Sequence, residues 1–286
     1  MRMLITGVSG HLGGTTARRA AAAGWDVAGT YFSNPADPGE WLDIRDRAAV
    51  DDHVRRVKPA VVVHTAAGRE DWPLIADGSA YVALAATRVG ARLVHVSTEA
   101  VFSGREGSYD EDALPDPVYR YGAAKAAAET AVRAIDPAAA VVRTSLILGY
   151  GRGAMERLTH DLVAGRARGL LFTDQIRKPI HVDDLADAQI ELSGNDYAGV
   201  LNVAGSDAVS RYELGILIAQ RDGIDPDRIP HGPIPAGLTL PADIRLTIDR
   251  ATRLLETRPR GCREFVPADA APTPALRTPA SPRTPS

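Results

Sequence analysis

The chain has little of several features that would place it in other protein classes. It holds one cysteine, Cys262, among 286 residues, which excludes an intramolecular disulfide framework and fits a reducing cytosol. No apolar run approaches the ~18 residues of a membrane span, and the first residues already read as a core strand, so we expect neither an anchor nor a secretory signal. A net charge of −3 indicates no nucleic-acid or membrane partner. These absences predict a cytoplasmic protein.

Lysine is also scarce. Of the 33 basic residues only three are lysines, Lys58, Lys125 and Lys178, so a retained lysine suggests a need for a compact ammonium. Lys125 lies four residues after Tyr121, and side chains with this spacing on a helix point the same way. An ammonium beside a phenol lowers the pKa of the phenol from about 10. The pair is therefore a candidate proton donor to a carbonyl, although a solvated helix pair has the same spacing.

Glycines cluster near the start of the chain. Residues 3–6 read as a short buried strand, and residues 12–23 as an alanine-rich helix. Glycines between a strand and a helix allow a sharp turn and let backbone N–H groups approach a phosphate at the helix N-terminus. The same glycines would also suit a turn in an unrelated α/β protein. The residues expected to face a dinucleotide here are Gly7, Ser9, Gly10, His11, Leu12 and Gly13.

Strands and helices alternate over the first two-thirds of the chain, which predicts a doubly wound parallel sheet of the Rossmann-like α/β class. The expected strands after the first are residues 26–30, 60–64, 92–97 and 139–144, and the expected helices are residues 46–57, 80–89 and 121–135.

The pattern weakens beyond about residue 150, which predicts a small C-terminal substrate-binding lobe. We assign residues 1–150 to an NAD(P)-binding domain, to which residues 176–205 return, and residues 151–175 and 206–266 to the lobe. Residues 267–286 hold six prolines among small residues and are predicted to be disordered. Helices are expected over residues 152–168 and 211–222, and residues 183–192 and 200–204 are expected to return the chain to the nucleotide-binding sheet.

Several segments match a known order of motifs: residues 6–13, 94–104, 117–125 with Glu129, 142–145, 174–175 with Pro179, 184–186 and 210–213. This order resembles the extended short-chain dehydrogenase/reductase superfamily and, within it, the dTDP-4-dehydrorhamnose reductase family. The resemblance covers about residues 1–265. It implies reduction of a keto group by a nicotinamide cofactor.

The resemblance also assigns catalytic roles. Tyr121 would donate a proton to the developing alkoxide, Lys125 would stabilise the tyrosinate and contact the nicotinamide ribose, and Thr98 would orient the carbonyl oxygen. The alternative for Thr98 is a hydroxyl that caps the backbone at a strand end. Glu99 is followed by Ala100 rather than by a second acid, which disfavours dehydration.

The end of the second strand, residues 29–33, carries no carboxylate to hold both ribose hydroxyls of NAD. Small residues such as Thr30 leave room for a 2′-phosphate, and Arg18 or Arg19 on the preceding helix could reach it. We therefore favour NADPH, with NADH as the alternative.

Four further residues are assigned to the cofactor. Asp43 and Ile44 resemble the superfamily's acid–hydrophobe pair beside the adenine, although Asp43 would also suit the start of a helix. Ala66 and Ala67 follow the third strand, at the edge where the cofactor is expected.

The resemblance implies a nucleotide-linked substrate, most simply the 4-keto group of a dTDP-6-deoxyhexose. The residues assigned to substrate binding are Glu99, Arg143, Arg152 and Arg211. The three arginines are candidates because a guanidinium fork matches the geometry of a diphosphate. We expect no metal ion. The family is also expected to form homodimers, and the sequence leaves the oligomeric state open.

Departures from the family keep two other hypotheses open. The family's helix asparagine, which orders water beside the lysine, has no counterpart in residues 74–77, and Leu146 stands where the family has tryptophan. The first alternative is a non-catalytic NADP(H)-binding subunit that resembles the regulatory beta subunit of methionine adenosyltransferase. The second is a reductase of a non-sugar ketone in specialised metabolism.

Overall fold

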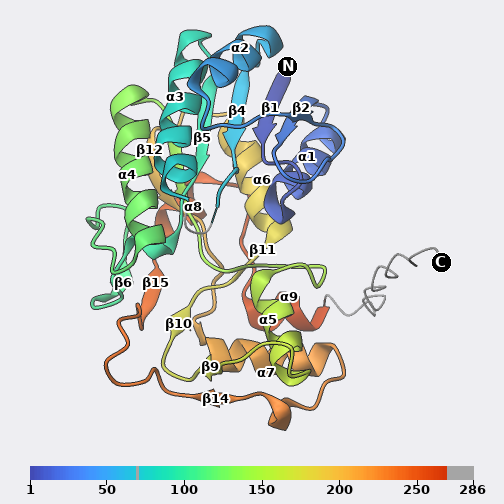
Figure 1. The fold of residues 1–286 in the computed structure, drawn as a ribbon, viewed down its shortest axis with the longest axis vertical. Coiled ribbons are helices and arrows are strands. Elements are labelled where there is room, and N and C mark those ends of the chain that lie inside the picture. Colours follow the sequence, from blue (N-terminus) through green and yellow to red (C-terminus); the bar gives the residue numbers. More distant parts are fainter. Residues whose placement is uncertain (69–70, 269–286) are drawn as a thin grey trace, which may run out of the picture.

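A seven-stranded parallel sheet forms the centre of the larger part of the molecule (Figure 1). The computed structural model describes residues 1–68 and 71–268. The strand order is β12-β7-β5-β4-β1-β2-β3, so the order reverses on either side of β1, and this confirms the expected doubly wound fold. The strands are β1 (Arg2–Thr6), β2 (Asp26–Tyr31), β3 (Glu40–Trp41), β4 (Val61–His64), β5 (Arg92–Val96), β7 (Ala140–Arg143) and β12 (Gly199–Asn202).

Helices cover both faces of this sheet. Val61 and Val63 of β4 belong to one buried cluster with residues of α1 and α6, whereas Val62 belongs to another with residues of α2 and α3. Strands buried on both faces read as continuous apolar runs, which is why their positions follow from the sequence. The helices are α1 (His11–Ala22) and α6 (Val182–Ser193) on the first face, and α2 (Arg47–Val57), α3 (Gly78–Arg88) and α4 (Arg120–Ile135) on the second.

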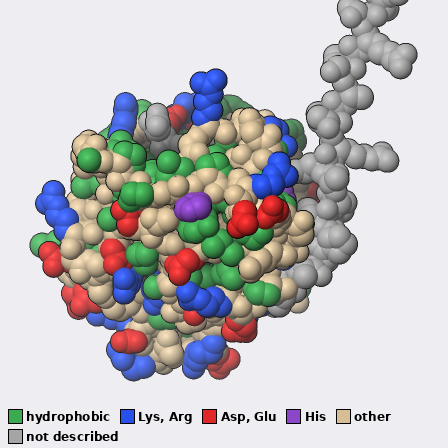
Figure 2. All heavy atoms as spheres, turned by 90° about the horizontal axis from the view of Figure 1, so that it is seen from below, with side chains coloured by type: hydrophobic (Ala, Val, Ile, Leu, Met, Phe, Trp, Pro, Cys, Tyr) green, Lys and Arg blue, Asp and Glu red, His purple; other side chains and the backbone are tan. Residues whose placement is uncertain are grey.

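A smaller lobe with its own core lies below the sheet in Figure 1. It contains α5 (Ala154–Val163), α7 (Arg211–Arg221) and α9 (Cys262–Ala268), with the paired short strands β9 (Leu171–Phe172) and β14 (His231–Gly232). Cys262 is buried in this core, and burial raises the pKa of its thiol to about 12, in keeping with a packing role. Figure 2 shows hydrophobic, basic and acidic side chains intermingled on the end of the lobe.

The boundary between the two parts differs from the expected one. Strand β15 (Ile244–Leu246) pairs with β6 (Gly107–Tyr109), and Ala251 of α8 (Asp249–Leu254) packs into the cluster beside α1 and α6. Residues 244–255 therefore belong with the Rossmann-like part rather than the lobe.

The end of α5 and the start of the predicted C-terminal tail also differ from the expected positions. Helix α5 ends at Val163 rather than at residue 168, because the chain turns at Gly165 with a φ of +70°. Helix α9 includes Pro267 and ends at Ala268, so the first two residues of the segment that was predicted to be disordered are helical. The rest of that tail lies outside the described residues.

Short elements connect the two parts: β8 pairs with β11, and β10 pairs with β13. Among the helices that the structure describes, none combines the length and apolar character required to cross a bilayer. The remaining elements are β8 (Ile147–Leu148), β10 (Ile176–Arg177), β11 (Ile180–His181), β13 (Val209–Ser210), η1 (Pro73–Asp77), η2 (Glu99–Val101) and η3 (Pro226–Arg228).

Candidate active site

The turn between β1 and α1 forms a tight backbone loop. The N–H groups of Gly7 and Val8 donate to the carbonyl oxygen of Thr30 over 2.8 and 3.0 Å. Gly7 has a φ of +79°, and a Cβ on Gly13 would lie 2.3 Å from the Gly7 carbonyl oxygen. These two positions therefore require glycine. The carbonyl oxygen of Thr30 therefore supports the loop. Because Thr30 is buried, its hydroxyl is shielded from an approaching ribose.

The N-terminus of α1 is suited to an anion. Gly10 caps the helix without a side-chain hydrogen bond, and the first turn carries no acid, so the first N–H groups are available to a phosphate. Burial, and then the charge of Arg152, lower the pKa of His11 to about 4, and its Nε2 is buried without a hydrogen-bond partner in the described chain. Ser9 is half-buried and Leu12 is buried. This cradle fits the pyrophosphate of a dinucleotide.

A buried hydrogen-bond chain fixes the loop after β4. Ser79 Oγ donates to a backbone carbonyl of η1 over 2.6 Å, so it accepts from His64 Nε2 over 3.1 Å. The other ring nitrogen, Nδ1, then accepts from Thr6 Oγ1 over 2.7 Å, and Thr6 in turn accepts from the N–H of Ala66 over 3.3 Å. This chain holds Ala66 against Gly7, while Ala67 is exposed.

The segment after β3 gathers charged and aromatic side chains. The guanidinium of Arg45 binds both oxygens of Asp43 and lies 5.0 Å from the ring centroid of Phe32, just past the end of β2. The hydrogen bond from Arg45 holds the pKa of Asp43 below its usual range. Ile44 is buried, with its side chain close to Gly78. The sequence alone did not reveal Arg45 as a cation at this edge.

The two arginines expected near the 2′-phosphate have different surroundings. Arg19 pairs with Asp187 of α6 and lies 3.5 Å from Asp183, so its charge is already balanced. Arg18 is exposed, and its NH2 donates to Thr15 over 3.3 Å.

Helix α4, which carries Tyr121 and Lys125, packs against the end of β5 and against η2, the segment that directly follows Thr98. Lys125 Nζ donates to the carbonyl oxygen of Val96 over 2.7 Å, two residues before Thr98. A Cβ on Gly122 would lie 2.0 Å from a carbonyl oxygen of η2, so only glycine allows α4 to approach this closely. The first turn of α4, which includes the half-buried Tyr121, therefore lies against the segment that begins after Thr98.

Lys125 is buried, and Thr98 and Tyr121 each have a close neighbour. Burial lowers the pKa of Lys125 to about 8, against the opposing charge of Glu129. Thr98 Oγ1 accepts from the N–H of Ala100 over 3.2 Å, so the capping contact is present and one lone pair of the oxygen is occupied. The ring of Tyr121 lies 6.4 Å from that of Tyr119.

Arg143 is not available to a substrate, which corrects the expectation from the sequence. Its side chain is 2% exposed, and its NH2 lies 2.8 Å from Glu129 Oε2. Nε also donates to Glu129, over 3.0 Å, and NH1 donates to the carbonyl oxygen of Ala113 over 3.3 Å. Ser97 Oγ donates to the same carboxylate over 2.5 Å. The ion pair fastens α4 to β7, and the hydrogen bond from Ser97 ties α4 to the residue that follows β5.

The other proposed substrate residues separate into two places. Glu99 is buried 3.1 Å from Arg177, and Arg211 interacts electrostatically with both of them. Arg152 is exposed and interacts with His11, so it lies toward the nucleotide loop rather than with Arg211. Arg177 was missed from the sequence, because only the fold brings β10 to Glu99.

The segment that lacks the family asparagine forms the π-helix η1, directly before α3. Such helices often occur at functional sites. Across residues 1–68 and 71–268, no three His, Cys, Asp or Glu side chains gather in a way that could hold a metal ion.

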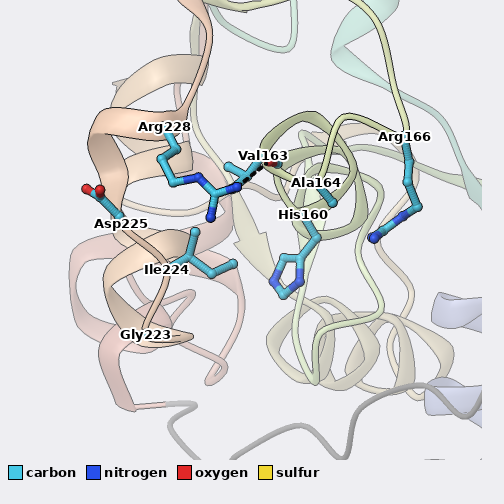
Figure 3. Close-up of a pocket in the computed structure, with 8 residues that line it drawn as sticks. All are labelled: His160, Val163, Ala164, Arg166, Gly223, Ile224, Asp225 and Arg228. Carbon is cyan, nitrogen blue, oxygen red and sulfur yellow. Dashed lines mark hydrogen bonds between the residues drawn. The ribbon is translucent and has the colours of Figure 1, made fainter.

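A surface pocket lies elsewhere in the lobe, between the C-terminal end of α5 and the segment after α7 that includes η3 (Figure 3). Arg228 NH2 donates to the carbonyl oxygen of Val163 over 3.2 Å at its rim. It shares no residue with the site above. Its lining is His160, Val163, Ala164, Arg166, Gly223, Ile224, Asp225 and Arg228.

Several proteins of known name are similar to this chain in sequence. A dTDP-4-dehydrorhamnose reductase of Mycobacterium tuberculosis is 35% identical over 245 residues, which are 80% of this chain and 78% of that protein. Methionine adenosyltransferase 2 subunit beta of Xenopus laevis is 30% identical over 241 residues, 76% of this chain and 71% of that protein. The similarity to the reductase and the family match confirm the expectation of an oxidoreductase.

A solved structure agrees as well. The dTDP-4-dehydrorhamnose reductase of Bacillus anthracis, in complex with NADP, superimposes with a TM-score of 0.80 at 25% identity and covers 93% of this chain and 97% of that one. The family model of the RmlD substrate binding domain matches residues 1–271. The chain therefore belongs to the RmlD substrate-binding-domain family, as its motifs indicated.

Proposed function

We propose that the protein reduces a keto group of a nucleotide-linked sugar with NADPH. The observation that supports this proposal is the close packing of α4, which carries Tyr121 and Lys125, against the end of β5 and the segment that follows Thr98. The nucleotide loop at Gly7 and Gly13 lies at the same edge of the sheet. A phenol, an ammonium and a hydroxyl beside a dinucleotide cradle are the groups that carbonyl reduction requires.

Each residue has a defined role in this reaction. The reduced nicotinamide, when bound, supplies the hydride that the carbonyl carbon accepts. Tyr121 donates its phenolic proton to the carbonyl oxygen, so that an alcohol forms. Lys125 stabilises the resulting tyrosinate by its positive charge, and Thr98 donates a hydrogen bond that orients the oxygen.

The cofactor assignment draws on the cradle and on a relative. The Bacillus anthracis reductase is in complex with NADP, and the free N–H groups at the start of α1 suit its pyrophosphate. Gly7, Ser9, Gly10 and Gly13 would surround the pyrophosphate. The edge formed by Asp43, Ile44, Ala66 and Ala67 would face the adenosine half, with NADH as the alternative cofactor.

The substrate assignment draws on the relatives' names and on the charged residues near Thr98. The 35% identical relative is a dTDP-4-dehydrorhamnose reductase, so a dTDP-linked 4-keto-6-deoxyhexose is the first candidate. Glu99 and Arg211, which interact with each other, would face the substrate, and Arg152, which interacts with His11, would face the nucleotide.

The direct test is NADPH oxidation with a panel of nucleotide-linked 4-ketosugars. Turnover by the wild-type chain, lost in Tyr121→Phe and kept in Tyr119→Phe, supports the proposal. Tyr119→Phe is the matched control because the two tyrosines are neighbours and only Tyr121 has the spacing to Lys125.

A regulatory subunit is the second candidate, because 30% identical relatives are beta subunits of methionine adenosyltransferase 2. That function predicts NADPH binding without turnover of any ketone in the panel. The same titration of cofactor, followed by the same assay, separates the two functions.

A further inference from the structure

Two buried imidazoles lie side by side on the face of the central sheet that α3 and α4 cover. His64 of β4 and His95 of β5 are partners in the strand register, and their ring centroids are 5.3 Å apart. Their side chains point to the same face as Val62 and Leu93, two residues before them, which pack in the cluster beside α2 and α3. His64 is 1% exposed and His95 is 0% exposed, so each ring depends on the interior for its hydrogen bonds.

The two rings differ in their partners. His64 uses both nitrogens, Nδ1 as the acceptor from Thr6 and Nε2 as the donor to Ser79. The Nδ1 and Nε2 atoms of His95 have no hydrogen-bond partner among the residues that the structure describes. A neutral imidazole carries one donor and one acceptor, and burying both unpaired is costly. His95 is therefore a polar side chain that the hydrogen bonds of the fold do not account for.

Lys125 of α4 is the charged group that acts most strongly on His95. Its Nζ donates over 2.7 Å to the carbonyl oxygen of Val96, the residue after His95. Burial, and then the charge of Lys125, hold the pKa of His95 well below its ordinary value and lower the pKa of His64 to about 3. Both rings are therefore neutral at working pH, and the lone pair of a neutral imidazole can accept a hydrogen bond from an ammonium.

The carboxylate that acts on Lys125 is engaged elsewhere. Glu129, one turn along α4, raises the pKa of Lys125. Its two oxygens, however, accept hydrogen bonds from Arg143 of β7 and from Ser97. Lys125 is 4% exposed, and a backbone carbonyl takes one of the three N–H donors of its ammonium. A second acceptor in the interior would therefore stabilise the charged lysine, and His95 offers one.

We propose that His95 is a positioning residue: a nitrogen of its neutral ring accepts a hydrogen bond from the ammonium of Lys125, directly or through one water, and keeps that lysine charged beside Tyr121. The inference rests on the proposed function, in which the positive charge of Lys125 stabilises the tyrosinate. His95 acts through the lysine and touches neither the ketone nor the cofactor in this role. The ionisable groups that bear on the pair are His64 of β4, Glu129 of α4 and, through Glu129, Arg143 of β7.

The pKa of Lys125 can be measured directly, because the chain has only three lysines. Lysine labelled with ¹³C at Cε gives three signals by NMR, and the signal that is lost in Lys125→Met belongs to Lys125. In the full chain, His95→Leu is expected to weaken the proton affinity of Lys125 by about tenfold, which lowers its pKa by about 1. The reason is that a hydrogen bond to a charged group is lost while its burial remains. His95→Gln keeps an acceptor and is expected to restore most of the difference.

The matched control is His53→Leu. His53 is 6% exposed and its Nε2 is also buried without a partner among the described residues, yet it lies in α2. This variant should leave the pKa of Lys125 unchanged. An unchanged Lys125 pKa in His95→Leu overturns the proposal. The titration needs no substrate, so it decides the role of His95 even if no ketone is turned over and the proposed function fails.

Urea titrations separate this role from a structural one. In the wild type the unfolding free energy rises above the native pKa of Lys125, about 8, because the unfolded state then binds the proton more tightly. In His95→Leu this rise is expected to begin about one pH unit lower, and kcat/KM for any ketone that is turned over should fall at correspondingly lower pH. A loss of stability that is equal at every pH, with the start of the rise unmoved, would make His95 structural and contradict the inference.

Discussion

Replacing Glu129 by glutamine perturbs the carboxylate that fastens the catalytic helix. In the wild type this carboxylate accepts from Arg143 over 2.8 and 3.0 Å and from Ser97 over 2.5 Å. The side chains of Arg143 and Glu129 are 2% and 3% exposed. Glu129 also stands one turn after Lys125 and raises the pKa of that lysine against the effect of burial.

Two effects follow from the loss of the charge. Arg143 stays buried without a counter-ion, and breaking a buried pair in this way costs ~3–5 kcal/mol. Since a domain is stable by only ~5–15 kcal/mol, this loss is a large fraction of the total. The pKa of Lys125 also falls below its wild-type value of about 8. The alkaline limb of kcat/KM should therefore move to lower pH.

Urea denaturation and a pH–rate profile measure the two effects separately. The matched control is Glu40→Gln, because Glu40 is 57% exposed in its pair with Arg56. Exposed ion pairs contribute little to stability, so this control should unfold at nearly the wild-type urea concentration. If Glu129→Gln unfolds together with the control and keeps the wild-type pH limb, the buried pair does not hold the site as reasoned here.

Three further predictions concern the cofactor loop and the lysine. Gly13→Ala should weaken NADPH binding by about tenfold or more in a fluorescence titration, because its Cβ would lie 2.3 Å from a loop carbonyl oxygen; Gly194→Ala, with nothing closer than 3.7 Å, should bind normally. The pKa of about 8 for Lys125 predicts that kcat/KM falls above that pH. In urea titrations the unfolding free energy should rise from about pH 8 to the unfolded-state lysine pKa of about 10.4, because the native state loses its buried proton first; Lys125→Met should abolish this dependence of stability on pH. His64→Leu should lower the unfolding free energy by ~1–3 kcal/mol in urea, because Thr6 loses its buried acceptor. Equal stability of His64→Leu and the wild type would contradict the hydrogen-bond chain.

The central sheet could be predicted because its strands carry their own signal. Val61, Val62 and Val63 form an apolar run that is buried on both faces, and the glycines after β1 mark the turn into α1. The short strands of the connecting segments carry no such signal. β10 and β13 are two residues long, and their pairing depends on contacts between distant parts of the chain.

The site was only partly visible in the sequence for a similar reason. The Tyr121–Lys125 spacing lies within one helix, so local geometry predicts it. Arg143 and Arg211 looked alike as free cations, because the sequence shows a charge and not its partner. Folding pairs Arg143 with a carboxylate two α4 turns past Tyr121 and leaves Arg211 beside a residue that is already paired.

Hydride transfer itself is the most direct test of the account. NADPH carrying deuterium at C4 of the nicotinamide is mixed with the protein and dTDP-4-dehydrorhamnose, and the product is examined by mass spectrometry. One deuterium at the former carbonyl carbon, with none transferred by Tyr121→Phe, is the predicted result. NADPH bound tightly while the ketone and other nucleotide-linked 4-ketosugars gain no deuterium would contradict the account.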